Sequence, residues 1–179
     1  ANDFVYSWRR LADPATASEY AWYMELMQVE NAPEIIAGDT SPEELGIRAV
    51  DDHTLEVKIT TPLPYFPQML VHGSTFPVLQ SAVEEHGDDW TDAGTLVGNG
   101  AYKLVEHQLG ERVVMEKNDT YWDADNVVME KITALTINDV NQALTRYLAG
   151  ELDRVDIPAG QYPRLKKEYP EQAVSTPYN

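Results

Sequence analysis

The first apolar residues of the chain recur with the period of a helix. Phe4, Val5, Trp8 and Leu11 lie three or four positions apart, which predicts a helix with one buried face. Asp3 stands at its start and is expected to cap it. The chain therefore opens on an amphipathic helix.

A second helix is predicted after the break at DPATAS. Thr16 and Glu19 have the spacing of a capping box, in which each side chain satisfies a free backbone N–H at the helix start. An apolar stripe follows, made of Tyr20, Tyr23, Met24 and Met27. A stripe of this composition is typical of a core-facing helix.

The next stretch predicts a β-hairpin. Leu55, Val57 and Ile59 alternate with polar residues, as in a strand with one buried and one solvated face, and GIRAV at 46–50 supplies the partner strand. DDHT at 51–54 is the connecting turn, and its two Asp residues are explained by turn chemistry, although a metal site with His53 is an alternative. SPEEL at 41–45 predicts a helical turn before the hairpin, and 61–72 is expected to wrap over its end.

The glycines in VGNGAYKLV raise the question of a phosphate-binding loop. Such a loop must lead into a helix, whose free N–H groups hold the anion. Gly98 and Gly100 instead precede two β-type runs, 101–108 and 112–118, which Gly110 joins as a hairpin. The two glycines are therefore expected to let the chain enter a strand tightly.

The remaining pattern is mixed. A short helix is predicted at 80–86, followed by a polar loop at 87–94. Further on, the pattern predicts a strand at 129–137, a helix from Asn138 to Gly150 and a strand at 151–157, an order that suggests a parallel crossover and α/β character. A helix at 161–170 and a last strand at 172–179 complete the prediction.

Composition narrows the classes of function. The 179 residues include 43% hydrophobic residues, enough for a core, but 30 Asp and Glu against 13 Lys and Arg give a net charge of −17. This charge repels phosphate backbones, so nucleic acid is not an expected partner. The excess of acidic residues has two explanations, which are solubility and binding of a cationic partner. There is no cysteine, and no apolar run is long enough for a membrane span. Because the chain opens on Ala1 within a helix pattern, an upstream segment is expected.

The sequence lacks the common signatures of catalysis. It contains neither Gly-x-Ser-x-Gly nor His-Glu-x-x-His, and the four histidines are scattered: His53, His72, His86 and His107. The abundant carboxylates make chance pairs uninformative. Nothing in these residues requires catalysis, and we expect no catalytic residue, no metal and no cofactor.

Four long segments resemble the oligopeptide-binding proteins of bacterial ABC importers, the family 5 extracellular solute-binding proteins. In order along the chain they cover 2–23 (NDFVYSWRRLADPATASEYAWY), 45–72, 99–123 (NGAYKLVEHQLGERVVMEKNDTYWD) and 146–153 (RYLAGELD). The resemblance implies a mixed α+β chain that is part of a type II periplasmic-binding-protein fold. It also implies a fragment, with 1–79 in a small extra subdomain, 80–179 in the first main lobe, and the opposite lobe absent.

The resemblance further implies how a ligand would be bound. An extended oligopeptide would be recognised through its main chain between two closing lobes in the periplasm, then passed to a membrane permease. Tyr20 matches a ligand-facing tyrosine of the family, and His72 matches a histidine near the side-chain pockets. A purely structural role is the alternative for both residues.

Two other functions remain open at this point. One is a non-catalytic protein-interaction module, and the less favoured one is a cryptic hydrolase. An apolar surface left uncovered by the absent lobe would also favour self-association of this fragment.

Overall fold

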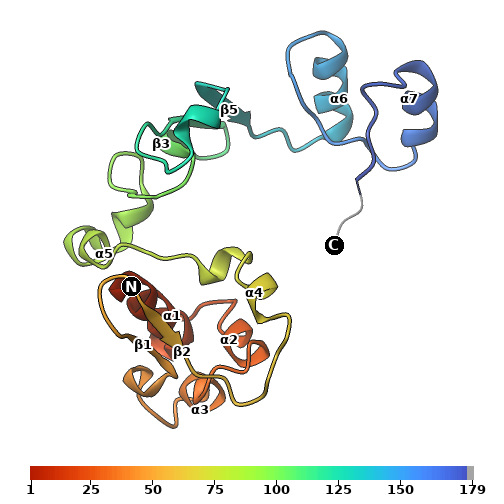
Figure 1. Cartoon of the computed structure of the whole chain (residues 1–179). Helices are drawn as coiled ribbons and strands as arrows, with labels where there is room; N and C mark the ends of the chain where they lie inside the picture. Colours follow the sequence, from red (N-terminus) through yellow and green to blue (C-terminus); the bar gives the residue numbers. More distant parts are fainter. Residues whose placement is uncertain (177–179) are drawn as a thin grey trace. The chain divides into compact units, whose positions relative to one another are not determined.

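The computed structural model describes residues 1–176, which divide into two compact units (Figure 1). Unit 1 comprises Ala1–Val105 and Glu116–Glu130, and unit 2 comprises Glu106–Met115 and the chain from Lys131 onward. This division follows contacts within the chain, and the assignment of 1–79 to a subdomain and 80–179 to a lobe stays a prediction.

The first helix forms as expected. α1 spans Asn2–Ala12 and buries Trp8 and Leu11. Its N-cap is Ala1, which makes no side-chain hydrogen bond, so the prediction that Asp3 caps the helix is wrong; Asp3 lies in the first turn. There its charge still complements the positive end of the helix dipole.

The second helix is shorter than predicted. Thr16 lies in a 3-10 turn, η1 (Pro14–Thr16), capped by the Asp13 carboxylate, which accepts from the Ala15 N–H at 2.9 Å. α2 spans only Trp22–Leu26 and has no side-chain cap, so the Thr16–Glu19 capping box is not formed. Because the helix starts late, Tyr20 lies in a turn before it rather than on its buried stripe.

The predicted hairpin is confirmed. β1 (Ile47–Ala49) and β2 (Leu55–Val57) pair antiparallel, with Ile47 opposite Val57. The Asp51 carboxylate accepts from the N–H groups of His53 and Thr54 at 2.8 and 2.7 Å, as a turn-forming Asp does. The 3-10 turn predicted before the hairpin is η2 (Pro42–Glu44).

The core of unit 1 joins these elements. α1, α2, α3 (Ala32–Ile36) and the hairpin each contribute buried side chains, as do the segments that connect them. These are Trp8, Leu11, Ala12, Tyr23, Met24, Met27, Val29, Ala32, Ile35, Leu45 and Ile47. Phe66 and Met69 of α4 (Phe66–Met69) pack against the same core, which fixes the 61–72 segment onto it.

The middle of the chain follows the pattern closely. η3 (Gly73–Thr75) precedes α5, which spans Gln80–His86 as predicted. The polar segment expected as a loop forms a 3-10 helix, η4 (Gly87–Thr91). Another 3-10 turn, η5, covers Ala124–Asn126.

A three-stranded sheet has the order β3 (Tyr102–Gln108), β4 (Arg112–Lys117), β5 (Lys131–Leu135). Gly110 joins β3 and β4 with a φ of 76°, as the hairpin prediction requires. A Cβ at Gly98 or Gly100 would meet no atom within 4 Å, so a crowded strand entry is not what favours glycine there. The entry is held instead by Asn118, whose side-chain amide donates to the Gly100 carbonyl at 2.8 Å.

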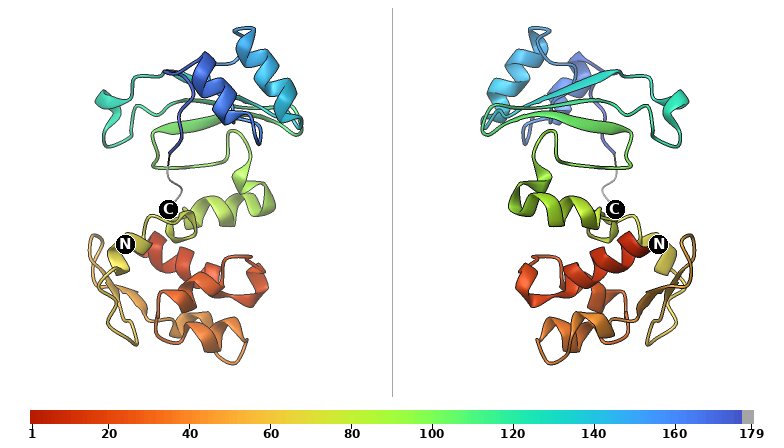
Figure 2. Two further views of the ribbon diagram at one scale, coloured as in Figure 1. Left: turned by 90° about the vertical axis from the view of Figure 1, so that its right-hand side faces the viewer. Right: turned by 90° about the vertical axis from the view of Figure 1, so that its left-hand side faces the viewer.

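Two helices lie side by side in unit 2 (Figure 2). α6 (Val140–Leu148) and α7 (Tyr162–Glu168) bury Leu144 and Leu165 against each other. Residues 151–157 form no strand, so the predicted parallel crossover is wrong. The apolar side chains of that segment, Val155 and Ile157, pack on the helix pair instead of on a neighbouring strand.

The last predicted strand is also wrong over 172–176, and the rest of it, 177–179, lies outside the described residues. Across residues 1–176, no helix has both the length and the apolar character that crossing a bilayer requires.

Candidate functional site

Four ring side chains from two distant segments meet in unit 1, and we call them the aromatic cluster: Tyr20, Trp22, Tyr23 and His72. The rings of Tyr23 and His72 are stacked, with centroids 4.3 Å apart and planes at 20°. The Tyr20 ring lies 5.2 Å from His72 and 6.4 Å from Trp22. The structure thus brings the two predicted site residues, Tyr20 and His72, into contact.

Tyr23 anchors the cluster to the core. Its side chain is buried, and its hydroxyl donates to the Met69 carbonyl at the end of α4, 2.9 Å away. A buried tyrosine hydroxyl needs such a partner. This bond ties α2 to the segment that supplies His72.

His72 is held by the turn that follows it. Its Nδ1 accepts from the Ser74 N–H at 3.3 Å and lies 2.8 Å from the Ser74 hydroxyl. Because Nδ1 is an acceptor, we assign the proton of the neutral imidazole to Nε2. Within residues 1–176, Nε2 makes no hydrogen bond, which leaves it available as a donor.

Thr75 fixes this turn to α1. Its hydroxyl lies within 2.9 Å of the carbonyls of Leu70 and His72, and its own carbonyl accepts from the buried Trp8 indole at 3.0 Å. Thr75 is 2% exposed; its bond from Trp8 is buried, and the two bonds of its hydroxyl are partly buried. The backbone that carries His72 is therefore rigidly placed.

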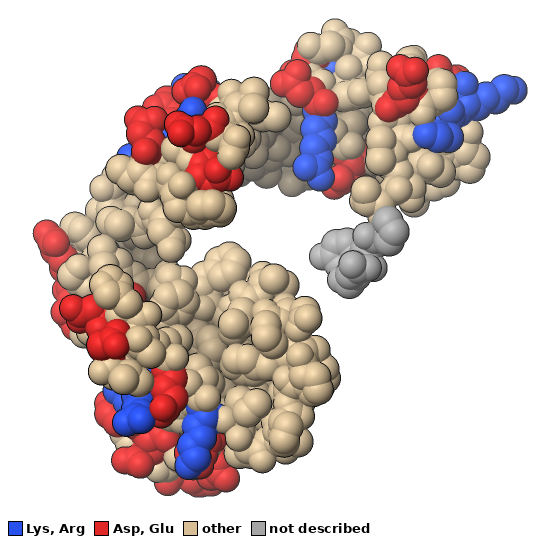
Figure 3. All heavy atoms as spheres, viewed as in Figure 1, with Lys and Arg blue, Asp and Glu red and all other residues tan. Residues whose placement is uncertain are grey.

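The outer rings of the aromatic cluster remain open to solvent. Tyr20 is 48% exposed and Trp22 is 50% exposed. No Asp, Glu, Lys or Arg occurs at 20–24 or in 59–83, although the exposed Glu19 and Glu25 flank the first of these segments. In Figure 3, the face over α2 and α4 accordingly shows neither red nor blue atoms.

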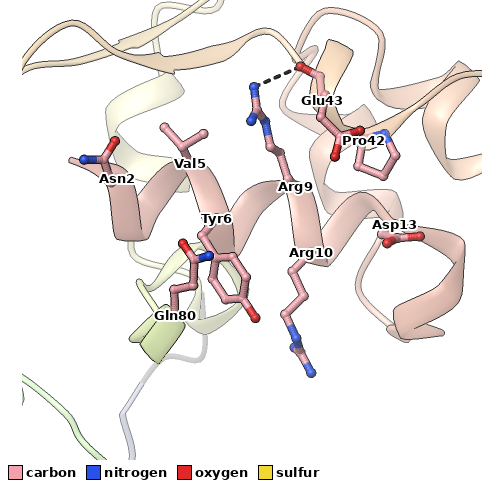
Figure 4. A pocket seen from close by; sticks show the side chains of 9 residues that line it. All are labelled: Asn2, Val5, Tyr6, Arg9, Arg10, Asp13, Pro42, Glu43 and Gln80. Atoms are coloured by element: carbon pink, nitrogen blue, oxygen red, sulfur yellow. Dashed lines mark hydrogen bonds between the residues drawn. The ribbon is translucent and has the colours of Figure 1, made fainter. Parts of the chain in front are cut away.

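A groove runs along α1 in unit 1 (Figure 4). Arg9 donates from its guanidinium to the Glu43 carbonyl at 2.9 Å, and Arg10 lies over the Trp90 ring at 5.9 Å. Two acidic residues line the groove: Asp13 caps η1, and the Glu43 carboxylate accepts a hydrogen bond from the Ser41 hydroxyl. This hydrogen bond, more than the charge of nearby Arg9, lowers the pKa of the Glu43 carboxyl. Asp13, Glu43 and Arg10 thus have partners within the protein, whereas the buried Nε–H of Arg9 has no acceptor among residues 1–176. Since the other charged groups are paired, we regard the groove as part of the scaffold.

Unit 2 has a smaller apolar crevice between α6 and α7, lined by the same side chains that form its core. Among residues 1–176, no three His, Asp or Glu side chains are grouped so as to hold a metal ion. The aromatic cluster is therefore the most distinctive surface, suited to holding a ligand by ring contacts and by a few hydrogen bonds.

The fold compares closely with solved binding proteins. The structure of the Escherichia coli murein tripeptide binding protein MppA matches with a TM-score of 0.91 and 44% identity over 96% of this chain and 34% of that one. Haemophilus influenzae OppA in complex with RPPGFSPFR matches with a TM-score of 0.89 and 44% identity, over 93% of this chain and 33% of that one. The fold is thus part of the type II periplasmic-binding-protein fold, as expected.

Sequence comparison specifies the family. The model for bacterial extracellular solute-binding proteins, family 5, matches residues 1–179. The periplasmic oligopeptide-binding protein OppA of Salmonella typhimurium is 46% identical over 99% of this chain. The chain belongs to family 5 of the bacterial extracellular solute-binding proteins. It spans about a third of the length of the curated relatives that it matches.

Sequence reasoning missed Trp22 as a site residue. A signal was present, because Trp22 lies off the predicted apolar stripe of Tyr20, Tyr23, Met24 and Met27, which marks it as a side chain that the core does not bury. The supporting bonds of Ser74 and Thr75 gave no sequence signal. Whether Tyr20 and His72 touch a ligand stays a prediction.

Proposed function

We propose that this chain forms part of an oligopeptide receptor of a bacterial ABC importer. The full receptor captures an extended peptide through its main chain between two closing lobes in the periplasm and delivers it to a membrane permease. The observation that carries this proposal is the close likeness of the whole chain to relatives named for oligopeptide and murein peptide binding. The relatives are named as binding proteins, in keeping with a function that makes and breaks no bond.

The aromatic cluster supplies this chain's share of the site. The Nε2–H of His72 donates to a peptide carbonyl, and the Tyr20 hydroxyl, which makes no hydrogen bond within residues 1–176, donates or accepts. Main-chain groups are common to all peptides, so such contacts give affinity without fixing the sequence of the cargo.

The test is peptide binding by the full-length product of the reading frame that carries this chain, measured by calorimetry with tri-alanine. Loss of one hydrogen bond costs about 0.5–1.5 kcal/mol, so Tyr20→Phe and His72→Ala are each expected to weaken binding about two- to tenfold. Tyr121→Phe and His53→Ala are matched controls away from the cluster and should leave affinity unchanged.

Chromatography of the recovered peptide completes the test. Intact tri-alanine after prolonged incubation agrees with a receptor, whereas cleaved peptide would favour the hydrolase alternative. If the full-length protein binds no peptide between three and nine residues long, the proposal is wrong.

A further inference from the structure

The outer edge of the aromatic cluster has features that main-chain recognition does not use. Trp22 donates no hydrogen bond from its indole to residues 1–176 and packs edge-on against Tyr23, with centroids 5.7 Å apart and planes at 73°. Half of its surface faces solvent. α2 buries the neighbouring side chains of Tyr23 and Met24 but leaves the Trp22 indole half exposed. The exposed side of this indole is a large apolar surface without a partner.

The Trp22 ring is held in place before any ligand arrives. It rests on Tyr23, whose hydroxyl is bonded to Met69 and whose ring is stacked on His72. The turn behind His72 is bonded in turn to buried Trp8 through Thr75. A ligand that contacts Trp22 therefore orders few additional side chains, which lowers the entropic cost of binding.

The charge of the surroundings limits which ligand groups fit. The chain carries a net charge of −17, yet 59–83 and 20–24 contain no charged residue. Because the exposed Glu19 and Glu25 flank 20–24, an acidic ligand side chain placed on the cluster would lose hydration and would also meet like charge. An apolar or aromatic side chain would lose no favourable hydration, and it would bury its apolar surface on the exposed rings of Trp22 and Tyr20.

We propose that Trp22 and Tyr20 form a subsite that selects an apolar, preferably aromatic, side chain at one position of the bound peptide. This inference rests on the proposed function and adds a side-chain preference to it. Trp22 is the specificity-determining residue, because it offers the larger exposed ring and has no part in the hydrogen bonds that shape the site.

The experiment measures the full-length protein with tripeptides that differ at one position. Phe, Leu, Ala, Lys and Glu are placed in turn at each position of an alanine tripeptide, and dissociation constants are determined by calorimetry. At one position we expect Phe to bind about three- to tenfold more tightly than Ala, the value of one aromatic pair. Glu at that position should bind more weakly than Ala.

Variants assign the preference to its residue. Trp22→Ala should bring the ratio of Phe to Ala affinity close to one, whereas Trp22→Phe should retain most of it. Trp122→Ala is the matched control: Trp122 also lies in unit 1, is 84% exposed and is outside the cluster, so the ratio should be unchanged.

The outcomes separate this inference from the proposed function. Three results would overturn the subsite while peptide binding itself stands. They are equal affinity for Phe and Ala at every position, tightest binding of Lys or Glu at the selective position, and a preference for Phe that survives Trp22→Ala. Absence of binding to every tripeptide would overturn both.

Discussion

Gly46 lies where three stretches of backbone meet in unit 1. Its N–H donates to the Glu30 carbonyl at 2.9 Å, and its carbonyl accepts from the Lys58 N–H at 2.8 Å. A Cβ at this position would lie 2.8 Å from the Glu30 Cβ and 2.9 Å from the Lys58 carbonyl oxygen. Both neighbours belong to the backbone or are directly attached to it, so they cannot rotate away.

Gly46→Ala is therefore expected to lower the free energy of unfolding by about 1–3 kcal/mol, the usual cost of overpacking. Urea unfolding followed by circular dichroism measures it. Gly98→Ala is the control, because its Cβ would enter open space, and its effect should stay within about 0.5 kcal/mol. Equal stability of the two variants would contradict this account of Gly46.

At the scale of an element, the hairpin turn depends on an ionised carboxylate. The N–H of His53 is the main group that lowers the pKa of the Asp51 carboxyl from its ordinary value of 3.8, and Thr54 adds to it. Because the folded pKa is the lower one, this contribution to stability is present above pH 3.8 and is lost as the pH falls through the folded pKa.

We expect the melting temperature of the native chain to exceed that of Asp51→Asn at pH 7, and this difference to shrink below pH 3.8. The amide keeps an acceptor oxygen but cannot titrate. Comparing the two proteins at each pH cancels the other carboxylates, and calorimetric scans supply the values. A difference that does not change with pH would mean that the charge of Asp51 has no role in the turn.

The entry to β3 depends on a buried amide. Asn118 is 1% exposed; its Nδ2 donates to the Gly100 carbonyl, and its Oδ1 accepts from the Thr120 N–H at 3.1 Å and the Thr120 hydroxyl at 2.7 Å. Its own N–H donates to the Ala101 carbonyl at 2.9 Å. One side chain thus joins the ends of two strands.

Asn118→Ala would remove these partly buried hydrogen bonds of a buried side chain and is expected to cost about 1–3 kcal/mol in the free energy of unfolding. Asn126→Ala removes an amide of the same chemistry that is exposed and, within residues 1–176, bonded through its side chain to Asp123 alone, so it should cost less than about 0.5 kcal/mol. Denaturant titrations of both variants provide the comparison. If Asn118→Ala leaves the free energy of unfolding unchanged, water replaces the lost hydrogen bonds.

For the whole molecule, charge is divided unevenly. Unit 1 contains 22 of the 30 acidic residues but only 6 of the 13 basic ones, whereas unit 2 contains 8 and 7. Nearly all of the net charge of −17 therefore belongs to unit 1, which also has the uncharged face over α2 and α4 (Figure 3). Repulsion between copies thus opposes any association through that apolar face.

Self-association of this chain should consequently increase with salt. The Debye length falls from about 30 Å at 0.01 M to about 3 Å at 1 M ionic strength, which removes the repulsion and leaves apolar burial. Sedimentation velocity at these two ionic strengths measures the effect. The Val71 side chain is 79% exposed, so Val71→Ser should weaken self-association at high salt. A chain that stays monomeric at both ionic strengths, or one whose assemblies dissociate on addition of salt, would contradict the expectation.

Patterns within short stretches of sequence determined most elements. α1, α5, the β1–β2 hairpin, the three strands of the larger sheet, α6 and α7 lie where periodicity and turn residues predict them. These signals suffice because an amphipathic stripe has one favourable way to bury its apolar side. The family membership was also readable in four segments of the sequence.

Tertiary structure alone decided the features that depend on distant partners. Val155 and Ile157 read as part of a strand, but α6 and α7 offered them an apolar surface without a strand partner. Tyr20 and His72 lie 52 positions apart, and their rings are brought together by the packing of α4 on the core and by the bonds from Tyr23 to Met69 and from Trp8 to Thr75. The sequence thus determined which side chains must be buried, and the tertiary packing decided which partners bury them. The physical reason is that the hydrophobic effect has no preferred direction, so any apolar surface of suitable shape can serve as the partner.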